Sequence, residues 1–371
     1  MRVAIDARLN AYRIGGIPQY TRRLTEALAA IAPETTILTL QHYEQHAPLV
    51  TAPNVKRLAC FTPPHHRWER FALPIELLRA RADVAHFPDF IAPTLRPCRA
   101  ITTIHDLAFL HFPEILDDAA RTFYGRVRES VQHSDAVIAV SEATRRDIVE
   151  RLQVAPETID VVYEAAGPAF APLEVPAHEI RMFGNEQISA GSFALFVSTI
   201  EPRKNLATLL RALRICRDRQ PDRNYRLVVV GARGWRDEGI FATLQELRLA
   251  DAIQFVGKVS DSELCWLYNA CRMYINPSLY EGFGLPLLEA MACGAACIAS
   301  QTSSLPEIGG NAAIYIPPLA VEQWADSIVA LWEDADRRAE LGRLGSTRAR
   351  QFSWERAARE TIAIYRRVCN Q

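Results

Sequence analysis

The sequence lacks several features that would place it in common classes of protein. It has 371 residues and a formal net charge of −1, so its charge does not favour a nucleic acid as the main partner. Its eight cysteines form no C-x2-C pair, and Cys293 and Cys297 have no nearby histidine to complete a zinc site. No apolar run reaches the roughly 20 residues that a membrane-spanning helix needs. We therefore expect reduced cysteines in a soluble, or at most peripheral, protein.

Motifs of other enzyme classes are also missing. The glycines near the N-terminus do not form G-x-G-x-x-G, and no acidic residue is placed for a dinucleotide ribose, which disfavours a dehydrogenase. The one D-x-D, Asp334-Ala-Asp336, falls between two helical stretches and predicts a helix cap. His65-His66 has no third ligand beside it. We expect no bound metal and no cofactor.

Short apolar runs recur along the chain, and most are separated by segments of helical length. This pattern predicts an α/β fold with parallel sheets covered on both faces, and the length favours two domains. Met1–Asp6 already reads as a strand, so we expect no signal peptide and a cytoplasmic protein. The expected strands are Val3–Ile5, Thr36–Leu40, Val84–Phe87, Ala100–Ile104, Ala136–Val140, Ile159–Val162, Phe193–Val197, Leu227–Gly231, Ile253–Val256, Met273–Ile275 and Ala296–Ala299.

The periodicity fades over residues 166–191, where glycine and proline are frequent. We therefore predict a first domain over residues 1–170, a linker over 171–189 and a second domain over 190–353. A last helix is expected within residues 354–371.

One stretch of the second domain combines a strand, a glycine turn and a helix. Gly282 and Gly284 allow a tight turn, and a helix over Leu285–Ala292 would offer free N–H groups and a positive dipole end to an anion. Glu281 and Glu289 flank this turn, and eight helical positions span roughly 12 Å. Two carboxylates at that separation suit the ends of a nucleotide-diphosphate sugar, although an ordinary strand–turn–helix would also account for the pattern.

Three further groups of candidate residues follow strands. Arg203 and Lys204 open a helix after the strand that ends at Val197, and cations there need an anion or an exposed position. A diphosphate would supply that anion. Gly15-Gly16 lies between the first strand and a helical stretch, a strand–loop–helix opening in which backbone N–H groups can face a phosphate or a sugar. A simple turn is an equally good interpretation of these two glycines. His105 stands at the carboxyl end of a strand, where α/β proteins bind ligands, and a structural role is the alternative.

The spacing Glu281-x7-Glu289, with Gly282–Pro286 between, resembles the signature of the retaining glycosyltransferases of family four. The resemblance implies the GT-B fold, in which two doubly wound Rossmann-like domains face a central cleft. It also implies that the first domain binds the acceptor, that the second binds the donor, and that the helix at 354–371 packs back on the first domain.

The resemblance also implies roles for single residues. Glu281 would orient the sugar, His105 would contact it, and Lys204 matches the lysine that binds the diphosphate. Many members carry an arginine where this chain has Ser198, so Arg203 is the substitute candidate. The donor-binding residues implied, including a nucleobase loop around Gly257, are Gly15, Gly16, Ser198, Gly257, Lys258, Gly282, Phe283, Gly284, Leu285 and Glu289.

The expected activity is transfer of a hexose, with mannose favoured, from GDP-mannose or a UDP-sugar as substrate to a saccharide or lipid-linked saccharide in polysaccharide synthesis. A glycosidase, a nucleotide-sugar epimerase and a non-catalytic sugar-nucleotide binding module are the alternatives. The segments Pro63–Phe71 and Arg121–Arg128 mix cations and aromatics. Each suits an anionic membrane surface, at the inner face of the plasma membrane, or a lipid-linked phosphate, and equally a helix with a solvated basic face.

Overall fold

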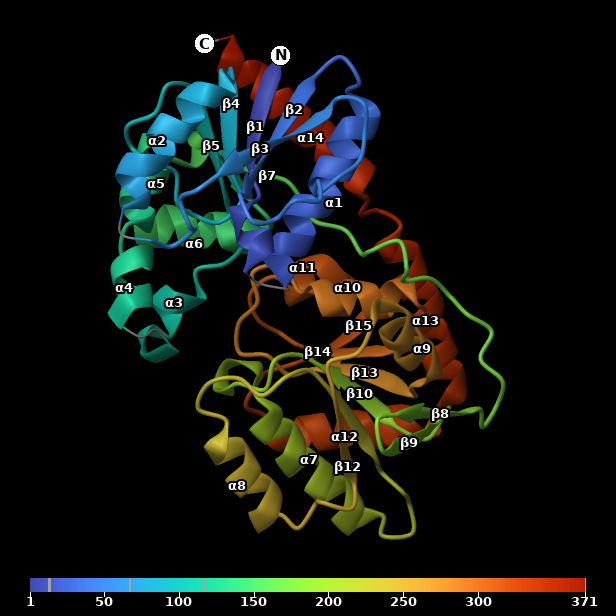
Figure 1. The fold of residues 1–371 in the computed structure, drawn as a ribbon. Helices are drawn as coiled ribbons and strands as arrows, with labels where there is room; N and C mark the ends of the chain where they lie inside the picture. The colour runs from blue at the N-terminus through green and yellow to red at the C-terminus, as the bar shows by residue number, and fades with distance from the viewer. Residues whose placement is uncertain (13–14, 67, 116–117, 371) are drawn as a thin grey trace. The chain divides into compact units, whose positions relative to one another are not determined.

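The computed structural model describes residues 1–12, 15–66, 68–115 and 118–370. The chain divides into two compact units, each with its own parallel sheet (Figure 1). Unit 1 consists of Met1–Glu164 and Ser353–Gln371, and unit 2 consists of Ala165–Phe352. The chain therefore passes twice between the units, and its last helix belongs to unit 1.

The sheet of unit 1 has seven parallel strands in the order β3-β2-β1-β4-β5-β6-β7. The six strands expected in this half are confirmed, and β3 is additional. The bounds are β1 Arg2–Asp6, β2 Thr36–His42, β3 Val55–Cys60, β4 Val84–Phe87, β5 Arg99–Ile104, β6 Ala136–Ala139 and β7 Ile159–Val161; the helices are α1 Gly16–Ile31, α2 Glu69–Ala80, α3 Ala108–His111, α4 Asp118–Tyr124, α5 Val127–His133, α6 Glu142–Leu152 and α14 Trp354–Cys369.

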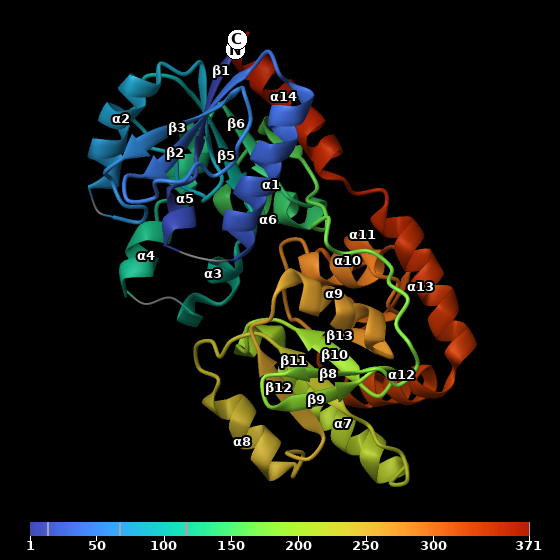
Figure 2. The same ribbon diagram turned by 45° about the vertical axis from the view of Figure 1, so that its right-hand side comes forward.

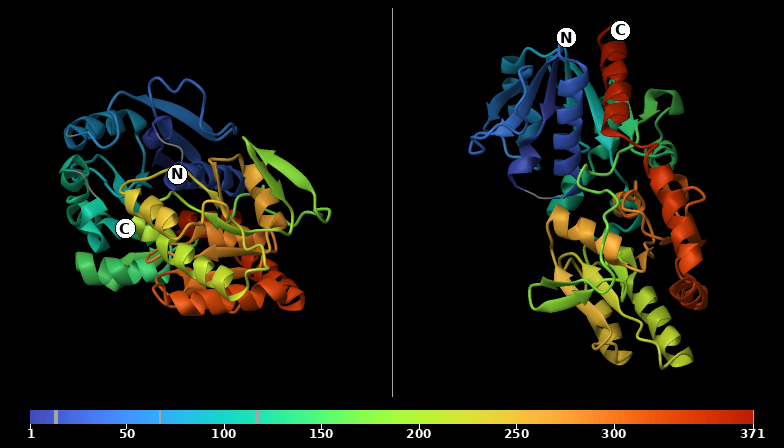
Figure 3. Two further views of the ribbon diagram at one scale, coloured as in Figure 1. Left: turned by 90° about the horizontal axis from the view of Figure 1, so that it is seen from below. Right: turned by 90° about the vertical axis from the view of Figure 1, so that its right-hand side faces the viewer.

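Helices cover both faces of this sheet because successive residues of its strands point to opposite faces and are apolar on both. In β1, Val3 and Ile5 pack in the cluster that contains α1 and α14, whereas Ala4 packs with Leu73 and Leu77 of α2. Figures 1 and 3 show α14 running beside α1.

A buried polar chain ties α14 to the sheet. His86 of β4 lies between the hydroxyl groups of Tyr365 in α14 and Thr103 in β5, at 2.6 Å from each. Burial lowers the pKa of His86 to about 3, so its neutral ring donates through one nitrogen and accepts through the other. Both hydrogen bonds of the ring are thereby satisfied inside the core.

Unit 2 contains six parallel strands in the order β12-β11-β10-β13-β14-β15 and a separate antiparallel hairpin, β8–β9. The five strands expected here are confirmed. The hairpin falls in the stretch predicted as a linker. The bounds are β8 Ile180–Phe183, β9 Glu186–Ser189, β10 Ala194–Val197, β11 Leu227–Val230, β12 Ile253–Gly257, β13 Met273–Asn276, β14 Cys297–Ser300 and β15 Ala313–Ile316; the helices are α7 Leu206–Arg219, α8 Glu238–Glu246, α9 Asp261–Ala270, α10 Leu285–Ala292, α11 Leu305–Gly309, α12 Val321–Glu333 and α13 Ala335–Ala349.

Figure 2 shows α9 and α10 on one side of this sheet and α7 and α12 on the other. Met273 and Ile275 pack in the core with α7 and α12, whereas Tyr274 meets Tyr268 of α9. Asp334 caps α13 by accepting from the Arg337 N–H at 2.8 Å, which confirms the predicted cap. No helix in the described part of the chain is long and apolar enough to cross a bilayer.

Both sheets reverse their strand order once. In unit 1 the reversal lies between β1 and β4, and in unit 2 it lies between β10 and β13. Open parallel sheets bind ligands beyond the carboxyl ends of the strands at such a reversal. These two edges are therefore where functional residues are expected.

The polar chain through His86 predicts a large effect of one substitution in α14. Tyr365→Ala removes a fully buried aromatic side chain and a hydrogen-bond partner of His86, so unfolding should become easier by about 3–5 kcal/mol. Urea unfolding of the full chain measures the effect. Arg359→Ala, on the exposed side of the same helix, should change stability by less than about 0.5 kcal/mol. Equal midpoints for the two variants would contradict this packing.

Candidate functional site

The strand–turn–helix unit predicted from the sequence is present in unit 2. β13 ends at Asn276, and α10 covers Leu285–Ala292, the range that was expected. Gly284 adopts a φ of +92°, and a Cβ there would lie 2.8 Å from Leu305 Cδ2, so the turn requires glycine. The first turn of α10 contains Pro286. The N-terminus of α10 therefore faces the edge at which β13 ends.

The loops after β10 and β13 are joined to each other. The Leu279 N–H donates to the Arg203 carbonyl at 2.9 Å, and Arg203 Nη1 donates to the Tyr280 carbonyl at 3.0 Å. Asn205, in the left-handed region at the start of α7, donates to the Pro277 carbonyl at 2.9 Å. These strands are neighbours at the reversal of the sheet. The bonds therefore fix the two loops that carry most of the predicted site.

An ion pair lies at the centre of this edge. Lys204 Nζ donates to both carboxylate oxygens of Glu281, at 2.7 and 2.9 Å, and the Ser278 hydroxyl donates to the same carboxylate at 2.8 Å. Both side chains are largely buried, with 13% and 10% exposed. The predicted lysine and acid, 77 positions apart in the chain, are thus in direct contact.

The Glu281 carboxyl group is ionised in this setting. Burial is the largest single influence and would raise its pKa, but the charges of Lys204 and Arg203 and the hydrogen bonds from Lys204 and Ser278 outweigh burial. The pKa of Glu281 is therefore lowered. A group of this kind stabilises the folded protein above the ordinary pKa of glutamate, and the stabilisation is lost as the pH falls through the lowered pKa.

Two serines that the sequence did not single out hold the backbone of Glu281. Its N–H donates to the Ser303 hydroxyl at 2.8 Å, and its carbonyl accepts from the Ser304 hydroxyl at 3.0 Å. Ser303 has a φ of +50°, a strained conformation that often accompanies functional sites. The contact joins residues more than 20 positions apart, so no local pattern could have indicated it.

Arg203 lies in the same cluster but is engaged by other groups. It pairs with Glu201 at 2.9 Å, and its Nη1 lies 3.8 Å from the Glu281 carboxylate. The indole N–H of Trp235 donates to Glu201 at 2.9 Å. Two cations and two carboxylates therefore balance in charge. That Arg203 supplies a second cation to a ligand stays a prediction.

The loops after β10, β11 and β12 meet closely. Gly231 has a φ of +138°, and a Cβ there would lie 1.9 Å from the Ser198 carbonyl oxygen. The Gly231 N–H donates to the Gly257 carbonyl at 2.8 Å, and Gly257 itself has a φ of +70°. Lys258 follows as an exposed residue. Ser198 and the predicted nucleobase loop are thus at the same edge as the ion pair.

The other predicted donor-binding residues lie in the turn and in α10. Glu289, half-buried within α10, accepts from the Tyr268 hydroxyl at 3.3 Å. Gly282 and Phe283 are buried in the turn, and Leu285 is the first residue of α10. The structure therefore gathers the predicted residues of unit 2 around one strand reversal.

The remaining predicted residues belong to unit 1. Gly15 caps α1 and Gly16 begins it, which confirms the expected strand–loop–helix opening. His105 follows β5, where its Nδ1 lies 2.8 Å from the Glu164 carboxylate and its Nε2 lies 3.0 Å from the Pro88 carbonyl. The ring is therefore oriented from both sides, and Glu164 is a partner that the sequence did not indicate.

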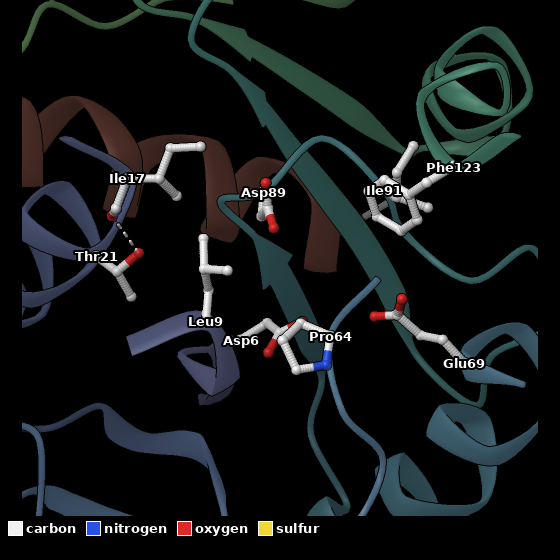
Figure 4. A pocket seen from close by; sticks show the side chains of 9 residues that line it. All are labelled: Asp6, Leu9, Ile17, Thr21, Pro64, Glu69, Asp89, Ile91 and Phe123. Atoms are coloured by element: carbon white, nitrogen blue, oxygen red, sulfur yellow. Dashed lines mark hydrogen bonds between the residues drawn. The ribbon is translucent and has the colours of Figure 1, made fainter. Parts of the chain in front are cut away.

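A small cavity of about 10 Å³ lies at the β1–β4 reversal of unit 1 (Figure 4). Asp6, the last residue of β1, and Asp89, which follows β4, line it with Glu69. The buried guanidinium of Arg8 pairs with both Asp6 and Glu69. Within the described ranges, no group of three or more histidine, cysteine or acidic residues is placed to hold a metal ion.

Parallel sheets that reverse their strand order and are covered by helices define a doubly wound α/β protein, and beyond one reversal lie a cation, a carboxylate and a helix N-terminus. Comparison with known proteins narrows the class. The family described as Glycosyltransferase Family 4 matches residues 14–166, and that described as Glycosyl transferases group 1 matches residues 181–348. Sucrose-phosphate synthase from Thermosynechococcus elongatus has a similar structure, with a TM-score of 0.76 and 22% identity over 99% of this chain and 98% of that one.

Two curated relatives from Escherichia coli are similar in sequence. O-antigen chain mannosyltransferase B is 32% identical over 284 residues, which cover 76% of this chain and 74% of that protein. Serotype-specific mannosyltransferase WbdA is 30% identical over 276 residues, or 73% of this chain, but the chain spans only 34% of its length. The chain belongs to glycosyltransferase family 4 and has the GT-B fold, and it is a glycosyltransferase.

The ion pair predicts a charge-specific loss of stability. Lys204→Met would leave the Glu281 carboxylate buried beside a more distant arginine, so unfolding should become easier by up to about 3–5 kcal/mol at neutral pH. Adding Glu281→Gln should restore part of the loss, because the amide carries no charge. Urea unfolding measures both variants. The cost of Lys204→Met should shrink on acidification, as wild-type Glu281 becomes protonated.

The control for this pair is Lys258→Met, which changes an exposed lysine of the same unit and should alter stability by less than about 0.5 kcal/mol. Additive effects of Lys204→Met and Glu281→Gln would mean that the two side chains do not interact.

The contact between Gly231 and Ser198 predicts a second loss. Gly231→Ala forces a side chain into a positive φ and against a backbone oxygen, which should cost at least about 1–3 kcal/mol. Gly239→Ala is the matched control, because its Cβ would meet no atom within 4 Å, and it should be neutral or stabilising by about 0.4–1 kcal/mol. Thermal melting compares the two, and equal melting temperatures would be inconsistent with this geometry.

Proposed function

We propose that this glycosyltransferase moves a hexose, with mannose favoured, from a nucleotide-diphosphate sugar to a saccharide or lipid-linked saccharide acceptor, with retention at the anomeric carbon. The observation that carries the proposal is the buried Lys204–Glu281 pair at the strand reversal of unit 2, beside the N-terminus of α10. A cation and a helix N-terminus beside an ionised carboxylate are the groups that a diphosphate and a developing sugar cation require.

The diphosphate is the leaving group in this proposal. Its oxygens gain negative charge as the bond to the sugar breaks, and Lys204 would stabilise that charge. An ammonium group has three donors, and two of those of Lys204 are directed at Glu281, so a diphosphate oxygen can accept the third. Arg203 and the N–H groups near Gly284 and Leu285 would add to the stabilisation without a metal ion.

The sugar gains positive character in the same step. Glu281 would lie beside it as an ionised carboxylate, which favours that charge and accepts hydrogen bonds from sugar hydroxyls. Its backbone is fixed by Ser303 and Ser304, so little reorganisation is needed during the reaction. Glu289 would accept hydrogen bonds from the ribose, and His105 of unit 1 is proposed as a sugar contact.

The sugar and the acceptor are proposed from the relatives. The names of both E. coli relatives describe mannosyltransferases, and one describes an O-antigen chain. Mannose and a polysaccharide acceptor, lipid-linked and reached from the cytoplasmic side of the membrane, are therefore the first choices.

A donor screen followed by transfer assays tests the proposal. Thermal melting with GDP, UDP, ADP and dTDP should identify the nucleotide, because binding to the folded state raises the melting temperature. Transfer from the matching sugar donor to mannose oligosaccharides should then persist in EDTA. NMR of the new anomeric centre reports retention or inversion. Lys204→Met and Glu281→Gln should each lower kcat by about 10²–10³-fold.

Lys56→Met changes an exposed lysine of unit 1 and should leave kcat unchanged. If Lys204→Met lost activity only in proportion to its unfolded fraction, the proposed catalytic role of Lys204 would be wrong. Isomerisation of the donor without an acceptor would favour the epimerase alternative, and an inverted product would exclude retention.

A further inference from the structure

The eight cysteines of the chain are free thiols, and two of them are in contact. Cys265 Sγ in α9 lies 3.9 Å from Cys293 Sγ at the end of α10, and both side chains are buried. The two helices lie side by side on one face of the sheet of unit 2 (Figure 2). A disulfide holds its two sulfur atoms about 2.0 Å apart, so a relative movement of about 2 Å would join them.

A cavity of about 390 Å³ lies beside this pair of thiols. The Cys265 thiol donates to the carbonyl of Ala171, which lines the cavity, at 3.6 Å. Cys293 directly follows Ala292, which lines it too. The exposed residue Arg350 is also part of the lining and provides a positive charge for a reagent that carries carboxylates. Ligand cavities in proteins commonly have volumes of about 300–1,000 Å³, so one small molecule fits here.

The chain segment beside Cys265 is irregular. Residues 162–179, all of which the structure describes, contain turns and irregular backbone but no helix or strand. The Asn269 side chain fastens this segment to α9, because it donates to the Ala171 carbonyl at 3.0 Å and accepts from the Leu173 N–H at 2.8 Å. Segments with few backbone hydrogen bonds of their own open locally at a low cost in free energy. Local opening at Ala171 would expose the Cys265 sulfur to the cavity.

The two thiols have different surroundings. Asn269 Nδ2 lies 3.6 Å from Cys265 Sγ, so an N–H released from Ala171 can donate to the Cys265 thiolate and stabilise it. Burial and the neighbouring Cys265 raise the pKa of Cys293. Cys265 is therefore placed to react first with a molecule in the cavity. Cys293 would react second, in an intramolecular step for which its position beside Cys265 compensates its low acidity.

We propose that Cys265 and Cys293 are a modification site, at which the disulfide of a small anionic thiol, such as glutathione disulfide, forms an internal bridge. The Cys265 thiolate attacks one sulfur of the reagent, which gives a mixed disulfide and releases one molecule of the small thiol. Cys293 then attacks the Cys265 sulfur, and its proton passes to the second departing thiolate. The reagent gains two electrons and two protons, and the two cysteines lose two hydrogen atoms.

The bridge would restrain the helix that carries Glu289. The Cys293 N–H donates to the Glu289 carbonyl at 3.0 Å, and the Glu289 carboxylate accepts from Tyr268 of α9. Drawing the end of α10 toward α9 would therefore shift Glu289 and weaken donor binding. This consequence rests on the proposed function, whereas formation of the bridge does not, and the bridge is measured without a donor.

Mass spectrometry of the full chain after incubation with glutathione disulfide tests the inference. A digest of the folded wild type should contain the Cys265 and Cys293 peptides joined to each other, and dithiothreitol should separate them. Cys293→Ser should instead retain a glutathionyl group on Cys265, because no second thiol displaces it. In Cys265→Ser the Cys293 thiol should stay free. The rise in melting temperature that a donor nucleotide causes should be smaller for the bridged protein than for the reduced one.

The matched control is Cys216→Ser, which changes a buried thiol of α7 that donates to the Ala325 carbonyl at 3.6 Å. This variant should form the bridge as the wild type does. Absence of the joined peptides in the wild type would overturn the proposal, and so would a bridge between other cysteines or one that forms only in urea. An equal nucleotide shift in bridged and reduced protein would refute the effect on donor binding alone. If no nucleotide stabilised the reduced protein, the proposed function would be at fault instead.

Discussion

The contact on which unit 2 depends is the ion pair between Lys204 and Glu281. A carboxylate this deeply buried is costly unless a cation and further hydrogen bonds compensate it. The chain supplies these from separate places: the loop after β10 brings Lys204, and the serines after β14 hold the backbone of Glu281. The pair therefore closes the loops of three strands around one point, at the reversal where a parallel sheet offers space for a ligand.

This arrangement has consequences for charge. Lys204 and Arg203 are balanced by Glu281 and Glu201, so the net charge of these four side chains is close to zero. In the proposed reaction, the diphosphate of a bound donor would share part of this charge balance. In the proposed reaction the anion would be favoured because Lys204 has a third donor and because the N-terminus of α10, whose first turn contains no acidic residue, adds a positive field.

Local sequence patterns predicted many of the strands and the bounds of α10. The strands predicted from apolar runs are present, and α10 has its predicted bounds, because Gly284 and Pro286 act on their immediate neighbours. Contacts between distant segments could not be predicted. Strand β3, with the sequence Val55-Lys-Arg-Leu-Ala-Cys60, has no continuous apolar run, and the roles of Ser303 and Glu164 depend on loops that only the folded sheet brings together. The spacing of residues in the sequence predicts a turn, but it does not predict which distant residues hydrogen-bond to that turn.

The two basic and aromatic segments of unit 1, Pro63–Phe71 and Arg121–Arg128, have similar compositions but different packing, which the sequence did not predict. Composition cannot distinguish a buried aromatic ring from an exposed one, because both can occur at the same helical spacing. The difference arises from what each helix packs against. Leu73 and Leu77 anchor α2 to the sheet, so its remaining apolar side chains must point outward. In the other segment Phe123 and Tyr124 complete a cluster with Phe90 and Phe109, so these two rings pack in the core.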